Sequence, residues 1–261
     1  PSLGDKTIGE GINFLGGDAS KIMENKRQAG DISSYIELHI EQGEILDRGE
    51  IAIGVVEGIV GIKRWNITVD GFANHAGTTP MNLRQDAMYS AALMVVEIRN
   101  IITGKEGKQV GTVGRIQAYP GAPNVIPGKV VFSLEIRDVD MSKINRLFDE
   151  IKHSAISIAK ANGTTVSFDQ FYEALAAITD ERIRNIVKSS ADSLGLSSLD
   201  MPSGAGHDAQ SLNGIAPLGM IFIPSVKGIS HAPDEFTSPQ QITNGANVLL
   251  QTIISMDKKI Q

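Results

Sequence analysis

The chain of 261 residues contains no cysteine, and this absence excludes several kinds of chemistry at once. Disulfide bonds, thiolate metal sites and cysteine nucleophiles all require a thiol. Lysine and arginine form no cluster and the formal net charge is -6, so the basic footprint of a nucleic-acid-binding protein is missing. No apolar run reaches the length of a membrane-spanning helix. These absences predict a cytoplasmic protein that binds neither nucleic acid nor a membrane.

The composition that is present, 41% hydrophobic and 21% charged residues, is typical of a soluble globular protein with one large domain or two ordinary ones. The middle of the chain has the clearest periodicity. Alternating apolar residues predict strands over residues 63–70, 110–119, 130–136 and 164–171. Helical spacing of apolar residues predicts helices over residues 83–102 and 144–159, the second ended by Asn162-Gly163.

The order strand, helix, strand, strand, helix, strand predicts a ferredoxin-like α+β module, in which an antiparallel sheet carries two helices on one face. We place this module at residues 58–173. The flanking segments, 1–57 and 174–261, combine strands with helices that begin near Asp180 and at Ser238-Pro239. They predict an α/β domain into which the module is inserted.

The segment Glu37-Leu38-His39-Ile40-Glu41 places a histidine between two glutamates in a half-buried strand. Because side chains alternate across a strand, Glu37, His39 and Glu41 are predicted to share one face. Two interpretations are open at this point. The polar face is either a solvated edge or part of a metal site.

Four of the five histidines lie in loops flanked by glycine or proline, or at strand ends. They are His39, His75, His207 and His231, whereas the fifth, His153, is predicted to lie on a helix surface. Strand ends commonly present ligands at a crevice, and neutral imidazole with carboxylate binds zinc or manganese. For each histidine a hydrogen-bonded structural role is the alternative, and no His-Glu-x-x-His motif completes a site.

Six motifs together resemble one family, the dinuclear metal amidases. The motifs are "ELHIEQG", "NHAGTTPMNLRQDA", "PNVIPG", "LEIRDVD", "SGAGHDAQ" and "MIFIPSVKGISHAPDE". The family includes allantoate amidohydrolase, N-carbamoyl-L-amino-acid hydrolase and ureidoglycolate amidohydrolase, which are relatives of aminoacylase and carboxypeptidase G. The resemblance covers nearly the whole chain. It implies a zinc-peptidase-like α/β catalytic domain with an inserted ferredoxin-like lid through which two copies form a homodimer.

The resemblance also implies roles for individual residues. His39 is expected to bind one of two divalent metal ions, zinc or manganese, and His231 the other. The positions expected to line the substrate are Gln42, His75, Asn124, Arg137, Gly206 and His207. His75 is similar to a residue that acts in the active site of the partner subunit, where it and Asn124 can donate hydrogen bonds to a developing oxyanion.

Arg137 is expected to bind the carboxylate of a small ureido substrate, because a planar guanidinium suits bidentate recognition. Without the resemblance, Arg137 would be interpreted as a solvated strand residue paired with Glu135. The expected reaction is hydrolysis of the ureido C–N bond of allantoate or an N-carbamoyl-L-amino acid, with release of ammonia and carbon dioxide. Bound divalent ions polarise such a carbonyl and lower the pKa of a water molecule.

One feature departs from the family pattern. Family members carry further metal ligands in a His-x-Asp motif and a Glu-Glu pair, and neither motif occurs in this sequence. The chain therefore resembles the C-terminal portion of a longer enzyme, and we expect it to be inactive by itself. The alternative is a non-catalytic dimerisation or binding module that has lost its metal centre, and a one-metal peptidase is a third possibility.

Overall fold

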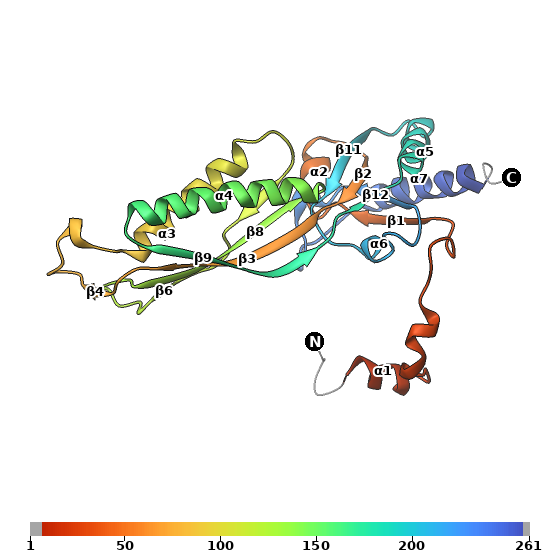
Figure 1. Ribbon diagram of the computed structural model, residues 1–261. Helices are drawn as coiled ribbons and strands as arrows, with labels where there is room; N and C mark the ends of the chain where they lie inside the picture. Colours follow the sequence, from red (N-terminus) through yellow and green to blue (C-terminus); the bar gives the residue numbers. More distant parts are fainter. Residues whose placement is uncertain (1–6, 258–261) are drawn as a thin grey trace.

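The computed structural model describes residues 7–257, which form two β-sheets with helices packed against them (Figure 1). The ends of the predicted α/β domain, residues 1–6 and 258–261, lie outside the described residues. One sheet, here called the mixed sheet, has the strand order β1-β12-β2-β10, and β11 also pairs with β2. The other, here called the antiparallel sheet, has the order β5-β8-β3-β9, and β6 also pairs with β8.

The mixed sheet combines strands from both flanks of the chain. Its strands are β1 (Tyr35–Ile40), β2 (Ile53–Ile59), β10 (Ala177–Ile178), β11 (Ser198–Ser203) and β12 (Leu218–Ile223). Its helical segments are α2 (Ile45–Arg48), α5 (Glu181–Ser193), α6 (Asp208–Ser211), η3 (Val226–Gly228) and α7 (Pro239–Asp257). Strand β1 runs parallel to β12, so the two strands end at the same edge of the sheet.

The two faces of β1 have different partners, as its alternating sequence predicts. Ile36, Leu38 and Ile40 pack into a core with buried residues of α5 and α7. Glu37 and His39 therefore face the other side of the sheet. Glu41 has a different role from Glu37 and His39, because it directly follows the strand and both of its carboxylate oxygens accept backbone N–H groups of α2. Glu41 thus satisfies the start of that short helix.

The antiparallel sheet has the predicted ferredoxin-like arrangement. Its strands are β3 (Gly61–Asp70), β5 (Val110–Thr112), β6 (Ile116–Tyr119), β8 (Lys129–Asp138) and β9 (Thr165–Ala174). Helices α3 (Ala87–Thr103) and α4 (Met141–Ala161) cover one face, where Trp65, Ile67 and Phe132 are buried with apolar residues of both helices. Among residues 7–257 no helix covers the opposite face (Figure 1), and its side chains along β3 and β8 are mostly polar.

Two predicted elements of this sheet have different bounds in the structure. The helix predicted over residues 83–102 begins at Ala87, because the Asp86 carboxylate accepts the N–H groups of Met88 and Tyr89 and caps the helix there. The strand predicted over residues 110–119 is two strands, β5 and β6. Between them the Arg115 N–H donates to the Ser133 hydroxyl instead of a strand carbonyl.

The predicted helix ends are confirmed where a cap was the signal. Ser238 and Gln241 exchange hydrogen bonds of 2.9 and 3.3 Å between backbone N–H and side-chain oxygen, which is a capping box in front of α7. After α4, the backbone of Gly163 adopts a φ of +67°, which a residue without Cβ enters without strain. Local chemistry therefore sets these ends.

The chain passes between the two sheets twice, from β2 to β3 and from β9 to β10. At the first crossing, a Cβ on Gly61 would press against Met141 Sδ and lie 2.9 Å from the Ala176 backbone nitrogen, so only glycine fits. The Lys108 ammonium, which follows α3, donates to Glu57 of β2 at 3.0 Å. The exact domain division at residues 58 and 173 stays a prediction.

Five short elements of the described chain, β4, β7, η2, α1 and η1, lie outside these two sheets. A ribbon of β4 (Asn74–His75) and β7 (Val125–Ile126) lies at the far end of the antiparallel sheet from β1 (Figure 1). The short helix η2 (Met81–Leu83) follows β4 in the chain. At the N-terminal side, α1 (Ile8–Phe14) and η1 (Ala19–Asn25) contain no buried residue and lie apart from both sheets. None of the helices in the described part of the chain combines the length and apolar character needed to cross a bilayer.

Asp180 offers a test of the fold, because its carboxylate caps α5 by accepting the N–H groups of Arg182 and Ile183. We expect Asp180→Ala to lower the free energy of unfolding by about 1 kcal/mol, and Asp180→Asn to keep most of it, since asparagine also caps helices. Urea unfolding at neutral pH measures both. A loss of similar size in the two variants would contradict the capping role.

The same carboxylate predicts a pH dependence. Hydrogen bonds from the Arg182 side chain hold the pKa of Asp180 below its ordinary value. Its charge therefore stabilises the folded state fully above the unfolded-state pKa, about 3.9, and this stabilisation is lost as the pH falls through the lower folded-state value. The stability difference between wild type and Asp180→Asn should shrink on acidification. A difference that grows towards low pH would have the wrong sign.

Candidate metal centre and substrate site

His39 lies at the C-terminal end of β1 with its ring held by the backbone. Its Nδ1 is 2.8 Å from the Ile40 carbonyl oxygen, which can only accept, so Nδ1 carries the proton and donates. In the neutral ring the Nε2 lone pair is then free. A histidine that donates one ring N–H to a carbonyl and offers the other nitrogen has the arrangement of most metal-ligating histidines.

Glu37, His39 and His207 form a group that could hold a metal ion. One ligand atom of each lies within 4.8 Å of the others, and the two imidazole centroids are 4.7 Å apart. Glu37 and His39 reach this place because they share the face of β1 that α5 and α7 do not cover. His207 reaches it from the loop between β11 and α6.

His207 is buried and held on both ring nitrogens. Its Nδ1 is 3.4 Å from Glu37 Oε1, and its Nε2 is 2.7 Å from the Ser203 hydroxyl oxygen. Burial lowers the pKa of His207, the charge of His39 lowers it further, and Glu37 and Asp208 act in the opposite direction with less effect. The ring is therefore neutral near pH 7, the form that binds metal ions.

The second expected metal ligand, His231, lies in the loop after β12, outside the group of three. Its Nε2 is 3.3 Å from the Gln42 side-chain nitrogen, and its backbone N–H donates to Glu235 at 2.9 Å. That backbone hydrogen bond first, and the hydrogen bond from the Ser230 side chain second, hold the pKa of Glu235 below its ordinary value, and the charges of His231 and His39 act in the same direction with less effect. Glu235 thus lies beside His231 in the loop that follows β12.

Gln42 and His231 also share an unusual backbone conformation. Their φ angles are +58° and +57°, in the left-handed region that costs a non-glycine residue about 1 kcal/mol or more. The Ser225 hydroxyl, which accepts the Gln42 N–H at 3.0 Å, helps to hold this turn. Strain of this kind concentrates where a site needs a side chain in one position.

Arg137 and Gly206 approach the site from the two sheets. Arg137 of β8 donates to the carbonyl oxygen of Gly204, in the same loop as His207, at 2.7 Å. The ion pair with Glu135 that was the alternative interpretation is also present, at 2.7 Å. A Cβ on Gly206 would meet only Gln210 Oε1, at 3.5 Å, so the protein leaves room beside this glycine.

His75 and Asn124 are brought together, but at the far end of the antiparallel sheet from His39 (Figure 1). The Ala76 N–H donates to the Asn124 carbonyl at 3.0 Å. The N–H groups of Gly77 and Thr78 both donate to His75 Nδ1, so the proton of the neutral ring is on Nε2. The exposed His75 therefore offers an N–H donor, the opposite tautomer to His39.

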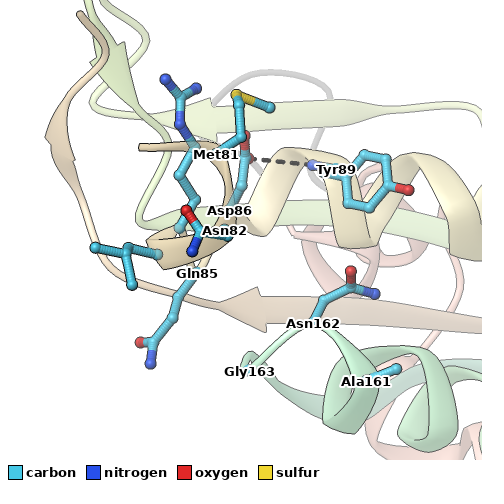
Figure 2. Close-up of a pocket in the computed structure, with 10 residues that line it drawn as sticks. Met81, Asn82, Gln85, Asp86, Tyr89, Ala161, Asn162 and Gly163 are labelled. Atoms are coloured by element: carbon cyan, nitrogen blue, oxygen red, sulfur yellow. Dashed lines mark hydrogen bonds between the residues drawn. The ribbon is translucent and has the colours of Figure 1, made fainter. Parts of the chain in front are cut away.

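A cavity of about 690 Å³ lies away from these histidines. It is formed by η2, the start of α3 and the end of α4, and none of the expected site residues lines it. Figure 2 shows Met81, Asn82 and Tyr89 on one side and Asn162 with Gly163 on the other. His153 likewise stays outside the site, exposed on α4 with Nδ1 2.6 Å from the Asp149 carbonyl oxygen, as expected for a surface residue.

Glu37, Ser203 and Glu235 complete the site beyond the residues expected from the sequence. The alternation in β1 pointed to Glu37, whereas Ser203 and Glu235 lie within two of the six motifs but had no role assigned to them. The set of two imidazoles and one carboxylate fits a divalent cation, and it suits zinc and manganese alike. Glu37, His39 and His207 are thus a candidate metal centre.

Comparison with known proteins identifies the class of this fold and site. The model of peptidase family M20/M25/M40 matches residues 9–255. The chain therefore belongs to this family of hydrolases. The family and its solved relatives confirm both the resemblance to metal amidases and the α/β fold class.

Individual relatives are more specific. An N-carbamoyl-L-amino-acid amidohydrolase of Paenarthrobacter aurescens is 37% identical over 232 residues, which are 89% of this chain and 56% of the relative. An allantoate amidohydrolase of Bacillus subtilis (strain 168) is 34% identical and covers 87% of this chain and 55% of its own length. A crystal structure of a hydantoinase/carbamoylase family amidase from Burkholderia multivorans has a TM-score of 0.88 and 34% identity. The match covers 97% of this chain and 61% of the amidase chain. The chain thus spans little more than half the length of these relatives.

Proposed function

We propose that the enzyme containing this chain is a metal-dependent amidohydrolase of small ureido carboxylates. The substrate is an N-carbamoyl-L-amino acid or allantoate, and the products include ammonia and carbon dioxide. The observation that carries this proposal is the convergence of Glu37, His39 and His207 within 4.8 Å, with His39 Nε2 free to bind a metal ion. The names of the amidohydrolase relatives support the choice of substrate.

The metal ions would be held by His39 and His231, with Glu37 and His207 beside them. When bound, such ions polarise a carbonyl and lower the pKa of water. The chain's own part is to orient the His39 ring through its hydrogen bond to the Ile40 carbonyl and to keep His207 neutral through burial, which lowers its pKa. Gln42 and Gly206 line the space next to these groups.

The remaining residues would bind the organic part of the substrate. Arg137 would take the carboxylate, for which it is placed by its contact with the loop that carries His207. His75 and Asn124 lie too far along the antiparallel sheet to serve the same chain's site, as the position of β4 in Figure 1 indicates. In a homodimer formed through residues 58–173, His75 would donate its Nε2–H to the oxyanion in the second copy.

The test is ammonia release from N-carbamoyl-L-amino acids and allantoate, with zinc or manganese supplied in turn. The full enzyme should hydrolyse at least one of these substrates and lose activity after treatment with a chelator. Hydrolysis that persists after complete removal of metal would count against the proposal. Location in the cytoplasm stays a prediction.

The 261-residue chain alone should release no ammonia above background, because it contains neither the His-x-Asp nor the Glu-Glu motif of the family. Turnover by the purified chain would contradict this expectation. A chain that dimerises but binds no metal, in an enzyme without activity, would instead favour the non-catalytic module.

A further inference from the structure

Arg137 uses only two of its N–H groups within the protein. Nε–H donates to Glu135 Oε1 at 2.7 Å, and Nη1–H donates to the Gly204 carbonyl oxygen at 2.7 Å. Among residues 7–257 no other acceptor takes a hydrogen bond from this guanidinium. Two bonds from different nitrogens fix the plane of the group, and the hydrogens on Nη2 stay available to a ligand.

Glu135 is itself fixed by a second arginine. Its Oε2 accepts Arg64 Nε at 2.5 Å, and the Arg64 guanidinium lies 4.6 Å from the centre of the Tyr172 ring. Glu135 and Tyr172 are the direct neighbours of Arg64 in the strand ladders of β8 and β9. A row of contacts thus runs across the strands from Tyr172 through Arg64 to Glu135, and then along β8 from Glu135 to Arg137.

The charges along this row leave Arg137 able to bind an anion. Burial raises the pKa of Glu135, but the hydrogen bonds and charges of Arg137 and Arg64 together outweigh it and hold the pKa below its ordinary value. Glu135 is therefore ionised near pH 7. Because Arg64 supplies a second positive charge, the group of three keeps a net positive charge for a ligand.

We propose that Glu135 is a positioning residue which, held by Arg64, orients the Arg137 guanidinium so that its free N–H groups receive the substrate carboxylate. This inference rests on the proposed function of Arg137. A long arginine side chain loses much conformational freedom when it binds. A guanidinium already held at two points loses less, so the orientation should increase affinity for carboxylates specifically.

The test is equilibrium binding of N-carbamoylglycine and of its neutral carboxamide to the purified 261-residue chain, measured by NMR titration. Wild type should bind the carboxylate more tightly than the carboxamide. Glu135→Gln, which removes the charge, and Glu135→Asp, which shortens the reach, should each weaken carboxylate binding about tenfold and leave carboxamide binding unchanged. In an Arg137→Ala background, Glu135→Gln should have no further effect.

Glu173→Gln is the matched control, because Glu173 pairs with Lys63 at 3.3 Å on the same sheet and has no contact with Arg137. It should bind both probes as wild type does. Tighter carboxylate binding by Glu135→Gln would show that Glu135 only weakens the charge of Arg137, and it would overturn the inference. Equal affinity of wild type for the two probes would also overturn it.

Equal losses for both probes in the Glu135 variants would indicate a general structural role and likewise reject the inference. Binding is measured without turnover. An enzyme that fails to hydrolyse any ureido substrate therefore contradicts the proposed function, while the carboxylate preference and its dependence on Glu135 are decided separately.

Discussion

Replacing His39 by alanine is expected to weaken zinc or manganese binding by at least about 100-fold. The loss of an outer-shell partner of a metal ligand already costs about 10–100-fold, and removal of the ligand itself costs more. His39 offers a free Nε2 because its Nδ1–H is used by the Ile40 carbonyl. Competition between the protein and a chromophoric chelator, titrated with each metal, measures the change in affinity.

His153→Ala is the matched control, since His153 is an exposed histidine on α4, outside the candidate metal centre. Its metal affinity should equal that of wild type. Glu37→Gln should give an intermediate loss, because it removes a charged oxygen from the same group of three. Unchanged binding by the His39 variant would show that the imidazole group is a structural hydrogen-bonded cluster.

Phe132→Ala should produce the largest loss of stability, about 3–5 kcal/mol in the free energy of unfolding. The side chain is fully buried in the centre of the antiparallel sheet, where α3 and α4 close over it. Its removal leaves a cavity lined by Ile67, Met94 and Ile151, which are held by two long helices and a ten-residue strand. Urea unfolding followed by circular dichroism measures the loss.

Phe171→Ala provides the comparison on β9, because half of that side chain is exposed to solvent. Its expected cost is about 1 kcal/mol or less. If the two variants were equally destabilised, the assigned core of the antiparallel sheet would be wrong. A second check is the metal affinity of Phe132→Ala, which should match wild type while the protein remains folded.

Much of the fold could be predicted because its signals are local. The alternation of β3 and β8 and the helical spacing of α4 each lie within one element, and the structure confirms these elements with extended bounds. The sequence signals for the helix caps were equally local, as at Ser238 before α7 and Gly163 after α4. The beginning of α3 was placed too early because the apolar spacing continues upstream of Asp86. The Asp86 carboxylate caps the N-terminus, so the helix begins only at Ala87.

The candidate site was predictable only in part. His39 and His231 stood out through strand position and the family resemblance, but the place of His207 beside His39 did not. The role of Glu41 at the start of α2 was not predicted, since periodicity cannot show that the strand ends at Ile40 and that a helix start follows. Ser203 lies in the motif "SGAGHDAQ" but had no role assigned, because a serine acquires a role only from what approaches it.

The sequence alone determined which residues of β1 face the core and which face away, because alternation is a property of the chain itself. Only the tertiary structure decided that His207, far along the chain, closes on Glu37 and His39, and that Arg137 reaches the Gly204 carbonyl across 67 residues. Such contacts depend on how loops close and how two sheets pack against each other. No periodic pattern of the local sequence encodes how these loops close and how the two sheets pack.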